Sequence, residues 1–167
     1  MRSLPAAVRT RFAAKRYMDD ILLVYAEAED WDHAKLVADF EESQCYQKPL
    51  KLEEGGNGTF LETSFQVTGS SVRFWLKNAN AGGVKKLWRY QHFDSYATYE
   101  QKRATLTVCL RKVQRMASDR DALESSGRDK IREFVDLGYP RRMLKAICNF
   151  LGASTRERGW FDVRDSI

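Results

Sequence analysis

Residues 16–24 read Arg-Tyr-Met-Asp-Asp-Ile-Leu-Leu-Val, which places two adjacent carboxylates, Asp19 and Asp20, between apolar arms. Branched and aromatic residues at 21–25 are typical of a β-strand, and residues 12–18 can form its partner. The two acids would then lie at the tip of a hairpin. Neighbouring acids are also common in ordinary solvated turns. On a stiff hairpin, however, they suit Mg²⁺, which binds through a few carboxylates together with substrate phosphates.

The residues after this hairpin predict one helix and a short antiparallel meander. Residues 31–40 have the apolar spacing of an amphipathic helix, and Asp30 is a suitable N-cap. Three strands are then predicted between glycine-containing turns, at residues 50–53, 59–67 and 71–76. The first eighty residues are therefore expected to be strands with a packed helix.

The C-terminal half predicts a small helical bundle. Residues 102–117 carry apolar side chains at helical spacing, which indicates one buried stripe. The stripe consists of Leu106, Leu110, Val113 and Ala117. A second helix is expected over residues 123–137, ended by Gly138 at a left-handed cap position. Pro140 suits the first turn of a third helix, which reaches Leu151.

These motifs resemble the reverse transcriptases. Tyr17-Met18-Asp19-Asp20 and the apolar residues after it resemble their catalytic hairpin. Later segments resemble the region after the palm in Penelope-type retroelement enzymes, which are related to telomerase. These segments are Tyr90-Gln91-His92-Phe93-Asp94-Ser95, Lys102-Arg103, Cys109-Leu110-Arg111, Ser118-Asp119 and Gly138-Tyr139-Pro140. The resemblance implies an α+β fold, with a partial polymerase palm at residues 1–80 and a linker and helical thumb at 81–167.

The resemblance also implies roles for individual residues. Asp19 and Asp20 would bind Mg²⁺ in the two-metal site of an RNA-directed DNA polymerase. The residues that would contact primer or template are Tyr17, Met18, Phe60, Leu61, Lys102, Arg103, Arg111, Lys112 and Arg115. Lys51 would protonate the departing pyrophosphate, with Lys48 as a rival. The family usually continues its Phe-Leu primer grip with Gly or Asp, whereas this chain has Glu62. The implied partners are an RNA template, a DNA primer or RNA–DNA duplex, and deoxynucleotides.

Charge is distributed unevenly along the chain. The net charge is +5, but the segments differ: residues 1–16 carry +5 (five basic, no acidic), residues 17–64 carry −9 (three basic, twelve acidic) and residues 84–120 carry +6 (nine basic, three acidic). A basic helix beside an acidic metal hairpin is suited to hold a phosphate backbone. The alternative is that its cations form the solvated face of an amphipathic helix.

Composition narrows the class of protein. With 167 residues and 43% hydrophobic content, the chain can form one domain or two small subdomains. It has neither an apolar run of about twenty residues, as a membrane span requires, nor the apolar core of a secretory signal. We therefore expect an intracellular protein, and the resemblance implies a nuclear one. Cys45, Cys109 and Cys148 have no metal-ligand spacing, so buried, reduced thiols are expected.

The main difficulty for a complete polymerase is the supply of carboxylates. Reverse transcriptases bring a further Asp from a strand many tens of residues before the catalytic hairpin, but residues 1–18 contain no acidic residue. Asp30 and Asp32 are better explained as helix cap and first-turn acids. We therefore expect the C-terminal palm and thumb of a reverse transcriptase, inactive alone, with an N-terminal polymerase part as a further partner. The alternatives are a non-catalytic nucleic-acid-binding module derived from a retroelement and a structural interaction protein.

Overall fold

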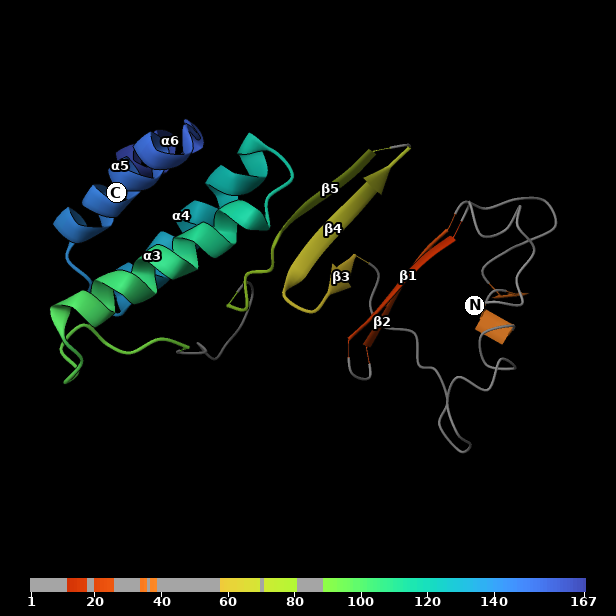
Figure 1. Cartoon of the computed structure of the whole chain (residues 1–167), viewed down its shortest axis with the longest axis horizontal. Coiled ribbons are helices and arrows are strands. Elements are labelled where there is room, and N and C mark those ends of the chain that lie inside the picture. Colours follow the sequence, from red (N-terminus) through yellow and green to blue (C-terminus); the bar gives the residue numbers. More distant parts are fainter. Residues whose placement is uncertain are drawn as a thin grey trace. The chain divides into compact units, whose positions relative to one another are not determined.

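The structure is a computed structural model of the whole chain (Figure 1). It describes residues 12–17, 20–25, 34–35, 37–38, 58–69, 71–80 and 89–167. The chain forms two compact units, Met1–Leu61 and Glu62–Ile167, which are described separately below. They are called the N-terminal and C-terminal units.

The N-terminal unit contains the predicted hairpin. Strand β1 (Phe12–Tyr17) pairs antiparallel with β2 (Asp20–Tyr25), and Tyr17 lies opposite Asp20. Only Met18 and Asp19 separate the paired residues, which is the commonest length for a hairpin connection. The hairpin prediction is therefore confirmed. Of the predicted helix, residues 34–35 and 37–38 are helical, and its remainder lies outside the described residues.

A three-stranded sheet has the order β3-β4-β5, with β3 at Thr59–Phe60, β4 at Thr63–Thr68 and β5 at Ser71–Leu76. Strands β4 and β5 pair antiparallel, with Thr68 opposite Ser71. The prediction of one continuous strand over 59–67 is wrong. It breaks at Leu61, whose φ of 53° is left-handed, and a left-handed residue cannot continue a strand. The strand predicted at 50–53 lies outside the described residues.

Four helices complete the C-terminal unit. They are α3 (Tyr99–Arg115), α4 (Arg120–Asp136), α5 (Arg141–Thr155) and α6 (Gly159–Asp165). A capping box joins Thr98 to Gln101 and begins α3, and Gly138, with a φ of 80°, follows α4. The three predicted helices are confirmed, while α6 was not predicted. Figure 1 shows α3 and α5 running in the same direction, opposite to α4.

The core of this unit lies between the helices. Leu106, Leu110 and Val113 are fully buried, as the stripe on α3 predicted, and Ala117 packs partly buried beside them. The short helix α6 adds Trp160, which is also fully buried and donates from Nε1 to Gln114 Oε1 at 3.1 Å. Burying a large apolar side chain contributes about 1.5–3 kcal/mol, so this core is the main source of rigidity for the surface residues of α3 and α5.

The β4–β5 hairpin is attached to the start of α4. Ser118 N–H donates to the Phe74 carbonyl at 2.9 Å, and Phe74 N–H donates to Ser118 Oγ at 3.0 Å. Arg73 Nε also lies 3.1 Å from Asp119 Oδ2. Because of these bonds, β4 and β5 fold together with the helices in the C-terminal unit, whereas the predicted palm covers residues 1–80. Within the described part of the chain, no helix is long and apolar enough to span a bilayer.

Candidate nucleic-acid interface

The hairpin residues are only partly described. Register places Asp20 at the first position of β2, opposite Tyr17 at the end of β1. Met18, Asp19 and Lys51 lie outside the described residues. Among the side chains that the structure does describe, no group of three or more His, Cys, Asp or Glu could hold a metal ion. The magnesium site at the hairpin therefore stays a prediction.

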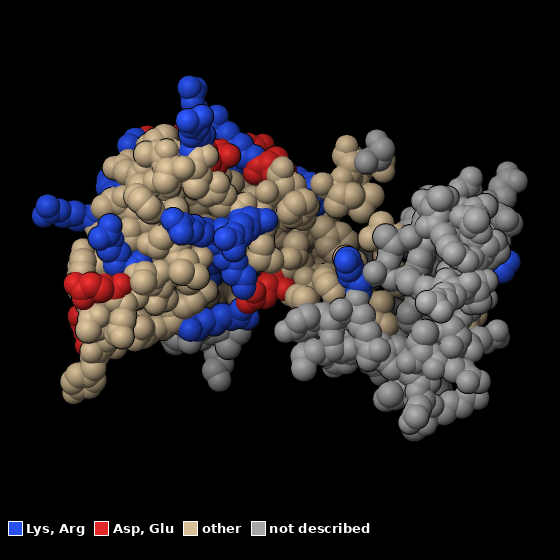
Figure 2. All heavy atoms as spheres, viewed as in Figure 1, with Lys and Arg blue, Asp and Glu red and all other residues tan. Residues whose placement is uncertain are grey.

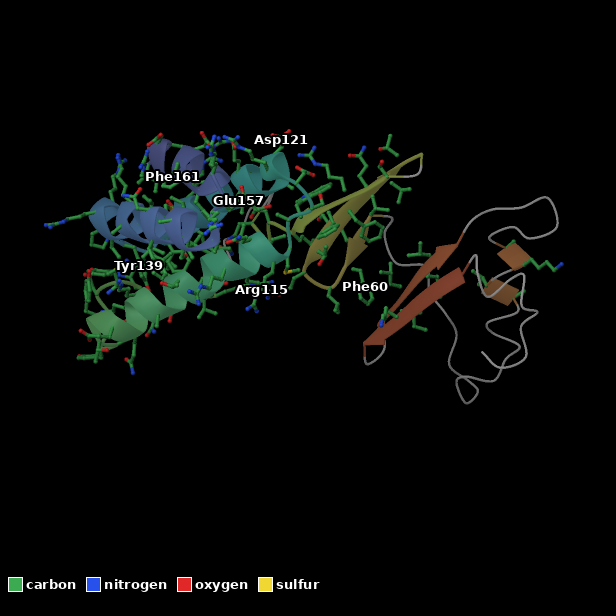
Figure 3. The ribbon with its side chains drawn as sticks, turned by 45° about the horizontal axis from the view of Figure 1, so that its top comes forward. Phe60, Arg115, Asp121, Tyr139, Glu157 and Phe161 are labelled. Atoms are coloured by element: carbon green, nitrogen blue, oxygen red, sulfur yellow. The ribbon has the colours of Figure 1, made fainter. Side chains whose placement is uncertain are left out.

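The two residues of the predicted primer grip are at the end of the N-terminal unit. Phe60 is half-buried on β3, and its position can be followed in Figure 3. Leu61 is exposed and left-handed. Holding a leucine in this conformation costs about 1–2 kcal/mol relative to right-handed backbone. The chain therefore reverses direction sharply after Phe60, although the predicted contact of these residues with a primer stays a prediction.

Glu62 binds two cations within the C-terminal unit. Its Oε1 accepts from Arg89 Nη1 at 3.0 Å, and its Oε2 forms an ion pair with Lys112 on α3. A carboxylate beside Lys112 offsets the attraction that this ammonium group would exert on a phosphate. Lys112 is thus the least available of the cations predicted on the exposed face of α3.

Lys102 lies in the interior. Its exposed fraction is 7%, and its Nζ donates to the Ser95 carbonyl at 2.7 Å. The same ammonium group lies 5.1 Å from the centre of the Phe93 ring. Its charge is therefore used to hold the segment before α3 against the helix, and Lys102 does not belong to the candidate interface.

Arg103, Arg111 and Arg115 are exposed on the side of α3 away from the buried stripe. Spacings of eight and four residues place them within about 120° of one another around the helix. Their predicted exposure is confirmed. Arg115 is labelled in Figure 3, where it extends from the end of α3 away from the helical core. No described ion pair involves any of the three.

Helix α5 extends this cationic face. It carries Arg141, Arg142 and Lys145 and no acidic residue. The guanidinium of Arg111 lies 5.9 Å from the centre of the Phe150 ring, which fixes the register between α3 and α5. Arg103 lies eight residues before Arg111, and Arg142 lies eight residues before Phe150. Because α3 and α5 run in the same direction, both arginines lie about 12 Å from the Arg111–Phe150 contact along the helix axes.

We call Arg103, Arg111, Arg115, Arg142 and Phe150 the α3–α5 surface. Figure 2 shows Lys and Arg side chains across the middle of the helical part, where Figure 1 places α3. The contribution of α5 was not predicted, because the basic region was taken to end at residue 120. Residues 141–155 contain no acidic residue, and this absence could have indicated a second cationic helix.

Helix α4 is different, since its cations lie beside carboxylates of the same helix. Arg128 Nη2 is 2.8 Å from Glu124 Oε2, Lys130 Nζ is 2.6 Å from Glu133 Oε2, and Arg132 Nη1 is 3.2 Å from Asp129 Oδ1. The exposed Arg132–Asp129 pair adds little stability, whereas Lys130 and Glu133 are only 14% and 10% exposed. All three pairs, however, place a negative group where a phosphate would have to bind. Helix α4 is thus not part of the cationic surface.

The described cysteines have no chemical role at this surface. Cys109 and Cys148 are free and buried, as predicted, while Cys45 lies outside the described residues. Burial raises the pKa of the Cys109 thiol and raises that of Cys148 to about 12. Both thiols therefore stay protonated at neutral pH, and a protonated thiol is a poor nucleophile and metal ligand.

No protein-family model, curated protein or solved structure matches this chain. The function of the chain is therefore inferred from the hairpin, the cations and their surroundings.

Proposed function

We propose that this chain is the C-terminal part of an RNA-directed DNA polymerase of the Penelope-like type. The observation that carries the proposal is the β1–β2 hairpin, because its register places Tyr17 and Asp20 opposite each other on either side of Met18-Asp19. In the tetrapeptide Tyr17-Met18-Asp19-Asp20, the two middle residues thus connect the strands, and the two outer residues are the last pair of the hairpin. Two carboxylates at such a tip would supply oxygen ligands, which Mg²⁺ prefers.

In this proposal the hairpin supplies only part of the polymerase site. Bound Mg²⁺ would stabilise the charge that develops on the reacting phosphate. Asp19 and Asp20 would hold the ion, and the residues beside them would contact the primer terminus. Two-metal nucleotidyl transfer needs a further carboxylate, and the incoming deoxynucleotide needs its own binding site. Both would come from an N-terminal polymerase part.

The C-terminal unit would hold the template–primer duplex. Its α3–α5 surface offers four arginines without acidic partners among the described residues, and the buried stripe of α3 fixes the helix that carries three of them. Arginine can bind a phosphate through two parallel N–H groups. Contacts of this kind do not depend on base sequence, which suits a polymerase that must move along any template.

Binding can be tested with two matched triple variants and a primer–template duplex. Replacing Arg103, Arg111 and Arg115 by Gln should weaken binding strongly, with unchanged circular dichroism, because Gln is a good helix former. The control replaces Arg128, Arg132 and Arg158 by Gln and removes the same charge elsewhere in the same unit. Equal weakening by both sets would show that net charge, and not the α3–α5 surface, causes binding.

The hairpin needs a separate test, for which Mn²⁺ is a spectroscopic probe. With duplex present, the parent chain should bind Mn²⁺ more tightly than a variant carrying Asp19→Asn and Asp20→Asn. A variant carrying Asp30→Asn and Asp32→Asn has the same charge change and should resemble the parent. Identical binding by the parent and the Asp19–Asp20 variant would refute the polymerase assignment.

A second candidate function is a nucleic-acid-binding module without catalysis. It is favoured by the position of the four arginines of the α3–α5 surface in the C-terminal unit, which does not contain the hairpin. This candidate predicts that the parent chain and the Asp19–Asp20 variant bind Mn²⁺ equally while both bind duplex. The two candidates therefore differ in the metal experiment and agree in the duplex experiment.

A further inference from the structure

Phe150 is exposed in the middle of a cationic surface. Its exposed fraction is 46%, although it belongs to α5, whose opposite side forms the core. Its neighbours one turn away, Ala146 and Ala153, are small and exposed. On α3, Val108 has an exposed fraction of 65%. Nearly half of Phe150 is therefore open to solvent, so that a flat ligand could rest on its ring.

Arginine holds this ring from one side. The guanidinium of Arg111 lies 5.9 Å from the ring centre, within the range of a cation–π contact. The contact limits the positions of both side chains and leaves much of the ring open to solvent. An aromatic ring held beside a cation is the combination with which single-stranded nucleic acids are bound, because bases stack on the ring while phosphates meet the cation.

We propose that the α3–α5 surface binds an unpaired nucleotide, with its base stacked on Phe150 and its phosphate on Arg111. Arg103 and Arg142 would bind phosphates of the same strand about 12 Å farther along the helices. This inference rests on the proposed function, since the same arginines hold the nucleic acid in both. It adds that the surface distinguishes unpaired strand from closed duplex, whose bases have no free face.

Charge complementarity favours nucleic acid over the other possible occupants. Helices α3 and α5 together carry eight basic residues and one acidic residue, Glu100. A membrane-surface helix needs a continuous apolar face, but the apolar faces of both helices are buried in the core. For a protein interface, Phe150 and Val108 offer little apolar area compared with the roughly 800 Å² per partner of a stable complex.

The test compares an unpaired and a fully paired ligand. The unpaired probe is a labelled oligothymidylate of about 12 nucleotides, within the usual range of single-strand sites. The paired ligand is relaxed, closed circular duplex DNA, which has no ends. Phe150→Ala should weaken oligothymidylate binding about 5- to 100-fold, while duplex binding changes less than about twofold. Phe150→Trp should retain binding, because tryptophan also stacks.

The controls separate the failure of this inference from that of the proposed function. Tyr96→Ala, which removes a fully exposed ring before α3, should leave oligothymidylate binding intact. If the parent chain binds neither ligand in a salt-dependent way, the proposed function fails. If it binds both, and Phe150→Ala weakens neither or weakens both equally, only the stacking inference fails. The stacking inference would also be overturned, in favour of a membrane surface, if Phe150→Ala lost binding to anionic phospholipid vesicles and kept oligothymidylate binding.

Discussion

The salt dependence of duplex binding should report how many phosphates the α3–α5 surface neutralises. Arg103, Arg111, Arg115 and Arg142 have no described carboxylate partner, so four phosphate contacts are expected at one for each arginine. The logarithm of the binding constant should then fall with the logarithm of salt concentration with a slope of about −3.6. Between about 50 and 200 mM salt, the affinity should fall about 150-fold.

Single substitutions test the contribution of each cation to the salt slope separately. Each Arg→Gln change among the four should reduce the slope by about 0.9, as fluorescence anisotropy titrations over several salt concentrations would measure. Lys112→Gln should reduce it by clearly less, because Glu62 already offsets that charge. A parental slope shallower than about −1 would refute the four-contact surface. An effect of Lys112→Gln as large as that of Arg111→Gln would refute the role given to Glu62.

Three further predictions follow from single contacts. Glu62→Gln should raise duplex affinity at low salt, because it releases Arg89 and Lys112 from their carboxylate partner. The control Asp121→Asn also removes one negative charge and should leave the affinity unchanged. A lower affinity of Glu62→Gln would contradict this prediction. Asp119→Ala should destabilise the C-terminal unit by about 1–2 kcal/mol, measured by urea unfolding, because it removes the N-cap of α4 and the bond to Arg73. Hydrogen bonds from the Ala122 N–H and the Ser118 hydroxyl lower the pKa of Asp119 from 3.8. The stability that Asp119 contributes should therefore be present at neutral pH and disappear as the pH falls below about 4. Equal stability of the parent and Asp119→Ala at pH 7 would contradict this prediction. Arg156→Gly should stabilise by about 0.5–1 kcal/mol because φ is 58°, while Arg156→Ala should not, and thermal melts of both variants check this.

Sequence periodicity was a good guide to the helices and a poor guide to single charged residues. The buried stripe at Leu106, Leu110 and Val113 was found because apolar spacing directly reflects burial. Lys102 was predicted to contact primer or template because Lys102-Arg103 resembles the retroelement enzymes, although it lies four residues before Leu106 and hence on the buried face. Helical spacing alone indicated that Lys102 is buried.

Other features could not be read from the chain. The left-handed Leu61 divides an apparently continuous strand, and no glycine or asparagine marks it. Glu62 and Lys112 are fifty residues apart, so only the folded chain reveals their pairing. Helix α6 begins with Gly159 and has seven residues, too few to show a clear period. Trp160 and Val163, three residues apart and both fully buried, were its only signal.

Local charge should matter more than the net charge of +5 in deciding where nucleic acid binds. At physiological salt, charges act over about 8 Å, so a phosphate responds to one helix face at a time. Helix α4 has four basic and five acidic residues, whereas α3 and α5 together have eight basic residues and one acidic residue. The positive charge of the helical bundle is therefore concentrated on α3 and α5. Residues 17–64, at −9, repel phosphate unless a cation offsets the carboxylates. Under the proposed function, duplex binding at the α3–α5 surface should therefore need no metal, whereas bringing a primer terminus to Asp19 and Asp20 should require Mg²⁺.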